Sequence, residues 1–266
     1  MIIDIHTHVF PDELAARALS ALVEHCQVTP RTDATIGGLR ASMRQAGIDR
    51  SAVMPIATKP SQVRGINQWA ADVKRQFEDI IPFGTLHPLL EDWPAEIERL
   101  AKDGIVGIKL HADYQDFFVD DPSLAPIYHA LADAGLILLM HSGVDIGLPF
   151  PVHCTPERLA GVLDEAPELT VIAAHMGGYI MWDDVEKYLV GRNVYFDTSY
   201  SLADLGPERM TALIRAHGVD RTLFGTDSPW TDQSAEVAGI RALPFSDEEI
   251  GAMLGGNAEK VLSFQF

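Results

Sequence analysis

The sequence predicts an α/β protein built as a single (β/α)8 TIM barrel, and three observations carry that prediction. Short apolar runs recur along the chain, helical patterns lie between them, and polar residues follow several of the runs. The runs are too short for helices and are apolar on both alternations, as in parallel strands buried on both faces. Eight such runs within about 230 residues fit a closed barrel better than an open doubly wound sheet.

The predicted strands are short and spread along most of the chain. They cover Ile2 to Ile5, Ala52 to Ile56, Ile80 to Leu86, Ile105 to Leu110, Leu136 to Met140, Leu169 to Ala174, Val194 to Phe196 and Thr222 to Phe224. The alternative doubly wound sheet lacks the G-x-G-x-x-G pattern after a strand that would indicate a dinucleotide site. A barrel is therefore the preferred fold.

Start and stop signals place helices between these strands. Thr155 and Pro156 are typical of a helix cap and a first helical residue, and Pro122 and Pro207 open helices in a similar way. Three helical patterns end in a glycine just before the next strand, at Gly47, Gly135 and Gly218. An extra C-terminal helix is expected around Asp247 to Leu262, where it caps or flanks the barrel.

Composition indicates one globular domain over residues 1–266. Hydrophobic residues make up 47% of the chain, which is enough for a sizeable core. The formal net charge of −18 repels phosphate backbones and anionic membranes, so neither is an expected partner. Cys26 and Cys154 are too few for a disulfide framework, and the sequence shows no signal peptide or membrane-length apolar run. We expect a cytoplasmic protein with a small-molecule substrate, and the sequence leaves a homo-oligomer open.

Asp4, His6 and His8 alternate along the first predicted strand and just beyond it. A period of two places all three side chains on one face, so the two imidazoles are expected to converge at the carboxyl end of the strand. An H-x-H pair alone is weak support for a metal site, because paired histidines in a strand are more often ordinary polar residues. The pair gains weight from the polar residues that end several later strands.

His141, His175 and Asp227 each end a later apolar run. In a barrel the carboxyl ends of the strands form one ring, and active sites of this fold lie there. Imidazole and carboxylate groups gathered in that ring suit zinc and neighbouring first-row metals. The sequence therefore predicts a bound divalent metal ion, with zinc preferred.

Lys109 and His111 share one alternation of the fourth predicted strand, whose other alternation is apolar. A lysine inside a barrel is unfavourable unless it is paired or functional, so these residues are predicted to bind the substrate. The alternative is a shifted register that leaves Lys109 solvated at the rim. Asp197, on the seventh strand, has two evenly weighted interpretations: it orients a metal ligand, or it caps the strand end.

The remaining histidines are discounted as site residues. His25, His129 and His217 lie on helical patterns and are expected at the surface or at helix ends, and His153 lies in a loop. His87 could face the site, but His-Pro at a strand exit is also ordinary turn chemistry.

Five segments together resemble the amidohydrolase superfamily, in the branch that includes aminocarboxymuconate-semialdehyde decarboxylase. They are Asp4-Ile5-His6-Thr7-His8, Gly107-Ile108-Lys109-Leu110-His111, Met140-His141-Ser142-Gly143, Ala174-His175-Met176-Gly177-Gly178 and Gly225-Thr226-Asp227-Ser228-Pro229-Trp230. The resemblance spans essentially the whole chain. It implies that His6, His8, His141 and Asp227 hold the metal and that His175 contacts the metal-bound water or the substrate. The Lys-Leu-His context of Lys109 is more similar to the one-metal branch than to branches with a carboxylated bridging lysine.

The expected activity is hydrolysis of a C–N or C–O bond in a small carbonyl substrate. A metal would activate water and polarise the carbonyl, Asp227 would accept a proton, and His175 would steady the oxyanion or deliver a proton. Decarboxylation of a small unsaturated or aromatic acid ranks second, because no arginine is placed at the strand ends to hold a carboxylate. A metal-free barrel that binds a ligand or a protein is disfavoured, since desolvated imidazoles without a metal gain nothing. Specificity is expected in the loops Phe10 to Arg31, Asp113 to Asp121 and Val144 to His153.

Overall fold

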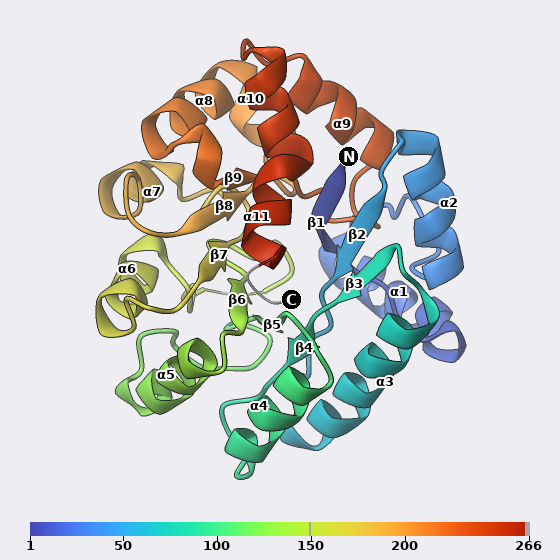
Figure 1. Cartoon of the computed structure of the whole chain (residues 1–266), viewed down its shortest axis with the longest axis vertical. Helices are drawn as coiled ribbons and strands as arrows, with labels where there is room; N and C mark the ends of the chain where they lie inside the picture. Colours follow the sequence, from blue (N-terminus) through green and yellow to red (C-terminus); the bar gives the residue numbers. More distant parts are fainter. Residues whose placement is uncertain (149, 264–266) are drawn as a thin grey trace.

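A ring of parallel strands surrounded by helices forms the protein in a computed structural model that describes residues 1–148 and 150–263 (Figure 1). One sheet has the order β1 (Ile3–Thr7), β2 (Arg50–Val53) and β3 (Ile80–Pro82). The other runs through β4 (Gly84–Thr85), β5 (Gly107–Leu110), β6 (Ile137–Met140), β7 (Val171–Ala173), β8 (Tyr195–Asp197) and β9 (Thr222–Leu223). Within each sheet, every strand pairs in parallel with its neighbour in the sequence, as the apolar runs predict.

Backbone hydrogen bonds close the two sheets into one barrel. Ile5 donates its N–H to the carbonyl of Phe224 at 2.8 Å, and Asp227 donates to the carbonyl of His6 at 2.8 Å, which joins β9 to β1. On the other side, Phe83 donates to the carbonyl of Val53 at 3.0 Å. Because Phe83 separates β3 from β4, these two segments are the halves of the strand predicted from Ile80 to Leu86. The predicted (β/α)8 barrel is confirmed.

The first strand contains an irregularity that the sequence did not predict. Asp4 pairs with Ser51 and Thr7 with Val53, so three steps along β1 match two steps along β2. Such a bulge turns the side chains that follow it to the other face. Asp4 therefore lies on the outer face, where it accepts hydrogen bonds from Thr226, whereas His6 lies inside. The prediction that Asp4 shares a face with the two histidines is wrong.

Helices follow the strands and cover the outside of the barrel (Figure 1). They are α1 (Asp12–Cys26), α2 (Ile36–Ala46), α3 (Val63–Gln76), α4 (Trp93–Lys102), α5 (Ala125–Asp133), α6 (Pro156–Glu165), α7 (Trp182–Tyr188), α8 (Leu202–His217), α9 (Gln233–Arg241), α10 (Asp247–Gly251) and α11 (Asn257–Ser263). The hydroxyl of Thr155 caps α6 by accepting from Arg158 N at 3.3 Å, as predicted. A break at Gly206, with φ of 71°, lets Pro207 open the second part of α8.

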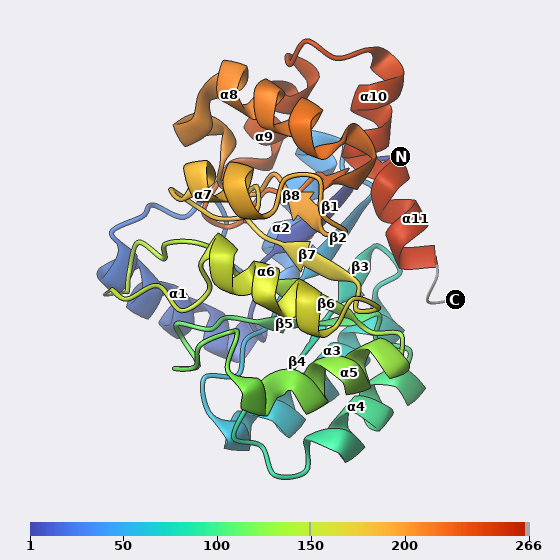
Figure 2. The same ribbon diagram turned by 90° about the vertical axis from the view of Figure 1, so that its left-hand side faces the viewer.

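The predicted C-terminal helix closes the amino end of the barrel. It is formed by α10, a π-helical turn (Ala252–Gly256) and α11. Ala258 and Val261 of α11 belong to the same buried apolar cluster as Ile3 and Leu223 inside the barrel. Figure 2 shows α11 on one side of the barrel and α1 on the opposite side. Within residues 1–148 and 150–263, no helix combines the length and the apolarity that a membrane crossing requires.

Candidate metal centre and active site

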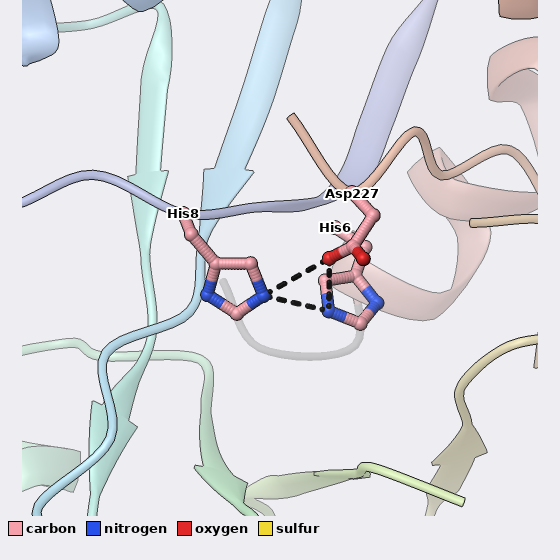
Figure 3. Close-up of side chains that lie close together, drawn as sticks. All are labelled: His6, His8 and Asp227. Carbon is pink, nitrogen blue, oxygen red and sulfur yellow. Dashed lines mark hydrogen bonds and ion pairs between the residues drawn. The ribbon is translucent and has the colours of Figure 1, made fainter. Parts of the chain in front are cut away.

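His6, His8 and Asp227 bring three electron-donating atoms together across the seam between β1 and β9 (Figure 3). His6 Nε2 lies 3.2 Å from His8 Nε2 and 3.5 Å from Asp227 Oδ1, and His8 Nε2 lies 3.1 Å from the same oxygen. Atoms bound at about 2.0–2.1 Å to a tetrahedral ion are about 3.3 Å apart. The three atoms are therefore spaced as the ligands of one small cation would be.

The other ring nitrogens of the two histidines decide which atoms carry hydrogen. His8 Nδ1 lies 3.0 Å from the carbonyl of Met54, which can only accept, so this nitrogen is the donor. His6 Nδ1 lies 2.9 Å from the carboxylate of Asp197 and donates in the same way. Both Nε2 atoms consequently present lone pairs to each other and to the carboxylate of Asp227. The Lys109 amine, 3.2 Å away, can donate to the His6 nitrogen, but the His8 nitrogen and the Asp227 carboxylate still face each other at 3.1 Å as two acceptors. This donor set fits a divalent metal.

His141 offers a fourth nitrogen with no partner of its own. His175 Nδ1 donates to the carbonyl of Ser199 at 3.0 Å, so His175 Nε2 accepts from His141 Nδ1 at 3.0 Å. This leaves His141 Nε2 buried and without a hydrogen-bond partner. The structure does not place that atom in the compact group of His6, His8 and Asp227, however.

A second compact group surrounds His141 instead. Its ring stacks on that of His111 with centroids 3.9 Å apart, and His111 Nε2 donates to Asp145 at 3.1 Å. These three residues form another arrangement of potential metal ligands. The four ligands implied by the sequence are thus divided between two neighbouring groups that both face the cavity described below.

Lys109 lies inside the barrel beside the first group. Its side chain is 1% exposed, and its Nζ is 3.2 Å from His6 Nε2. Burial lowers the pKa of Lys109 to about 8, although Asp197 and Asp227 act in the opposite direction. The alternative of a shifted register with Lys109 at the rim is therefore wrong. The chain places a fixed amine next to the candidate metal ligands.

Asp197 makes the hydrogen bonds that both of its interpretations require. One carboxylate oxygen accepts from His6 Nδ1, and the other accepts from the backbone N–H groups of His175 and Ser199 at 3.0 and 3.1 Å. Burial alone would raise the pKa of Asp197, but the adjacent His6 and the hydrogen bonds hold it well below its usual range. Burial lowers the pKa of His6 to about 4, with Lys109 acting in the same direction. His6 is therefore a neutral imidazole near pH 7.

A cavity of about 590 Å³ opens from these groups toward α1 and α3. Much of its wall is aromatic or aliphatic, including Phe10, Trp69, Tyr179, Tyr200 and Trp230. Asp227, His175, His141, His111 and Lys109 all contribute to its lining. The predicted loop from Phe10 to Arg31 differs from expectation, because its apolar spacing forms helix α1 over the cavity.

No arginine lines the cavity among the residues that the structure describes. Three arginines of the helical and turn segments are engaged elsewhere. They form ion pairs between Arg40 and Asp79, between Arg64 and Asp92, and between Arg192 and Asp164. The amine of Lys109 is consequently the cation available to an anionic substrate at the inner end of the cavity.

The discounted histidines mostly behave as expected. His25 and His129 are exposed on helices, and His153 lies in an irregular segment with Nδ1 3.2 Å from the carbonyl of Ala112. His87 accepts from Leu89 N at 3.2 Å in the turn after β4. His217 lies at the end of α8, the second of the two expected places, and it is buried there, 1% exposed and stacked on Phe196.

Sequence reasoning missed Asp145 and Ser199. Ser199 continues the alternation of Asp197 by one period of two, and that signal could have found it. Asp145 lies four residues beyond His141 in an irregular segment, where no periodicity predicts the direction of a side chain.

Comparisons with known proteins agree with this architecture. The chain matches the family model described as amidohydrolase over residues 3–264. It is similar to the solved structure of an uncharacterised TIM-barrel protein from Bordetella bronchiseptica, at 22% identity and TM-score 0.80, with 99% of each chain covered.

Two decarboxylases with solved structures are similar as well. 5-Carboxyvanillate decarboxylase from Sphingomonas paucimobilis is 18% identical, with TM-score 0.74 and 98% of each chain covered. A dihydroxybenzoic acid decarboxylase from Polaromonas, with bound manganese and 2-nitroresorcinol, is 19% identical, with TM-score 0.77 and coverage of 100% of this chain and 97% of that one. The search of curated proteins gave no match. With its family match over nearly the whole length and its closed barrel, this chain belongs to the amidohydrolase family.

Proposed function

We propose that the protein is a metal-dependent decarboxylase of a small aromatic or unsaturated carboxylic acid. The buried amine of Lys109, 3.2 Å from His6 Nε2, carries this proposal. Hydrolysis was preferred from the sequence because no arginine is placed at the strand ends to hold a carboxylate. The structure buries the amine of Lys109 beside the proposed metal ligands, where it would hold a carboxylate instead. Two similar structures, both decarboxylases, point the same way.

The metal ligands that we propose are His6, His8, Asp227 and His141. The first three already have the spacing of a common coordination shell. His141 would join them through Nε2, the buried nitrogen that has no other partner. Three imidazoles and one carboxylate suit zinc or manganese, and a manganese ion is bound in the similar Polaromonas enzyme.

When bound, a divalent metal would supply a positive charge that holds the acid and stabilises negative charge developing on its oxygens. Lys109 would bind the substrate carboxylate from the side of β5. In the reaction the bond between the carboxylate and its carbon breaks, the electron pair stays on that carbon, and carbon dioxide leaves. The same carbon takes one proton, which comes from solvent, and we assign the relay of that proton to the carboxylate of Asp227, which lines the cavity.

His175 was expected to contact the substrate or the metal-bound water. Its Nε2 accepts from His141 Nδ1 and its Nδ1 donates to Ser199, so both ring nitrogens are engaged. We therefore propose that His175 acts by orienting His141 toward the metal. His111, held by Asp145 and stacked on His141, would border the substrate on the other side.

Hydrolysis remains a second candidate because of one observation. Among the residues that the structure describes, no arginine lines the cavity, and a neutral ester, lactone or amide would need no carboxylate clamp. The metal and the barrel alone do not choose between the two reactions.

The test compares both reactions on protein reconstituted with zinc or manganese. Release of carbon dioxide is measured from a panel of aromatic and unsaturated acids, and hydrolysis from esters, lactones and amides. We expect carbon dioxide release, lowered about 100-fold in kcat/KM by Lys109→Met through loss of the charge-assisted contact. Lys102→Met, which removes an exposed lysine at the end of α4, is the matched control. Hydrolysis of a neutral substrate without any carbon dioxide release would overturn the proposal.

A further inference from the structure

We propose that the cavity selects a monocarboxylic acid whose apolar body is longer than one aromatic ring, and that it rejects an acid with a second anionic group. The inference rests on the proposed function, because it specifies the acid that reaches Lys109. Three features support it: the size of the cavity, the apolar character of its outer walls, and the distribution of charge along it.

The volume exceeds what a single-ring acid needs. A cavity of about 590 Å³ lies within the range of roughly 300–1,000 Å³ that accommodates drug-sized ligands. An acid of one ring, held at Lys109, would leave much of this space filled with water against apolar side chains. A longer apolar body would displace that water and gain from its release.

The walls beyond the polar groups are apolar on two sides. From the α1 side come Leu14, Leu22 and Val28, and from α3 come Ile66 and Trp69. Figure 2 shows α1 outside the ring of strands, on the side away from α11. An acid held by its carboxylate inside the barrel would therefore extend its far end between these side chains.

The charge along the cavity disfavours a second anion. Lys109 is the one lysine or arginine among the described lining residues, and it stands at the inner end. Asp145 also lines the cavity, with only 13% of its side chain exposed. A carboxylate at the outer end of the ligand would be desolvated among apolar groups, without a cation to pair with.

A matched set of acids tests size and charge separately on the metal-loaded full chain. The parent is 2-hydroxybenzoic acid, whose position 4 points away from the carboxylate. The three derivatives carry phenyl, 4-carbamoylphenyl or 4-carboxyphenyl at that position. The carbamoyl and carboxyl groups are close in size but differ in charge.

We expect kcat/KM for the phenyl derivative to exceed that of the parent by at least about tenfold, since a larger apolar body is buried. The carbamoyl derivative should stay within about tenfold of the phenyl derivative. The carboxyphenyl derivative should fall at least about 100-fold below the carbamoyl one, because it alone buries a second charge. Equal values for the carboxyphenyl and carbamoyl derivatives would overturn the inference, as would a parent that reacts faster than the phenyl derivative.

A gain of function provides an independent check. Ile66→Lys places a cation on the α3 wall, and Ile66→Met changes the same side chain without adding charge. The carboxyphenyl acid should improve at least about tenfold with Ile66→Lys and not with Ile66→Met. Equal behaviour of the two variants would contradict the role of charge.

The result also separates this inference from the proposed function. If no acid releases carbon dioxide, decarboxylation is refuted. The selection of a long apolar monocarboxylic acid is then tested by the dissociation constants of the same four acids, measured by calorimetry on the metal-loaded protein. The same order of affinities supports the inference, and equal affinities overturn it. Release of carbon dioxide from all four acids at equal rates would preserve the reaction and refute the selection.

Discussion

Replacing Asp197 by asparagine should weaken metal binding while leaving the barrel folded. The amide oxygen of Asn can still accept from the backbone N–H groups of His175 and Ser199. Its NH₂ group would then face His6 Nδ1, which at present donates to the carboxylate at 2.9 Å. Two donors in contact are unfavourable, so His6 should move its hydrogen to Nε2, the atom that faces His8 and Asp227.

The size of the expected change in metal affinity follows from the lost hydrogen bond between His6 and the carboxylate of Asp197. A hydrogen bond to a charged group contributes about 1.5–3 kcal/mol, and His6 must forgo it to present a lone pair to the metal. Since about 1.4 kcal/mol corresponds to a tenfold change in affinity, that range predicts a loss of metal affinity of roughly 10–150-fold. Asp197→Asn should therefore raise the metal Kd by one to two orders of magnitude, in line with other residues that orient metal-bound histidines.

Competition with a chelator of known affinity measures this Kd, and thermal unfolding of the metal-free protein checks the fold. Asp145→Asn is the matched control, since it also removes a carboxylate that contacts a histidine, here His111. We expect little change in Kd for the control. An unchanged Kd in Asp197→Asn would refute the reasoning, and a loss confined to Asp145→Asn would move the metal to the group around His111.

Three further outcomes are expected. His8→Ala should lose the metal, because His8 belongs to the compact group with His6 and Asp227. His175→Ala should keep most of it, because among the proposed ligands His175 hydrogen-bonds only to His141, which lies outside that group; equal metal content in the two variants would contradict this. Burial lowers the pKa of His217 from 6.5 to about 4, so between these pH values the unfolded chain protonates the ring and the folded chain does not. The free energy of unfolding should therefore fall by about 3 kcal/mol as the pH drops from 6.5 to 4. His217→Gln should flatten that part of the acid dependence in denaturant titrations, and an unaltered slope would count against it. Gly143→Ala should lower the unfolding free energy by at least about 1–3 kcal/mol, since φ is 86° and a Cβ would collide with the backbone of Tyr179; an unchanged denaturation midpoint would contradict this.

The positions at strand ends could be predicted because alternation is a strong local signal. Lys109 lies between the apolar residues Ile108 and Leu110, so the face that carries them fixed its direction toward the interior. His141 was predicted from its position at the end of an apolar run, because β6 is apolar on both alternations. Both side chains line the cavity, as the carboxyl ends of barrel strands predict.

Features that depend on distant contacts could not be predicted in this way. The bulge in β1 is visible only in its pairing with β2, and without it the direction of Asp4 was wrong. Asp145 reaches His111 from a segment outside any strand or helix. The break at Phe83 likewise divides an apolar run that has no charge to mark it.

The seam between β1 and β9 has a consequence for the order of assembly. His6 and His8 are made at the start of synthesis, and Asp227 is made more than two hundred residues later. The three side chains meet only when the last strand docks against the first through the bonds of Ile5 and Asp227. A growing chain on the ribosome thus carries two of these donors but cannot present the third, so metal loading would report that the ring has closed.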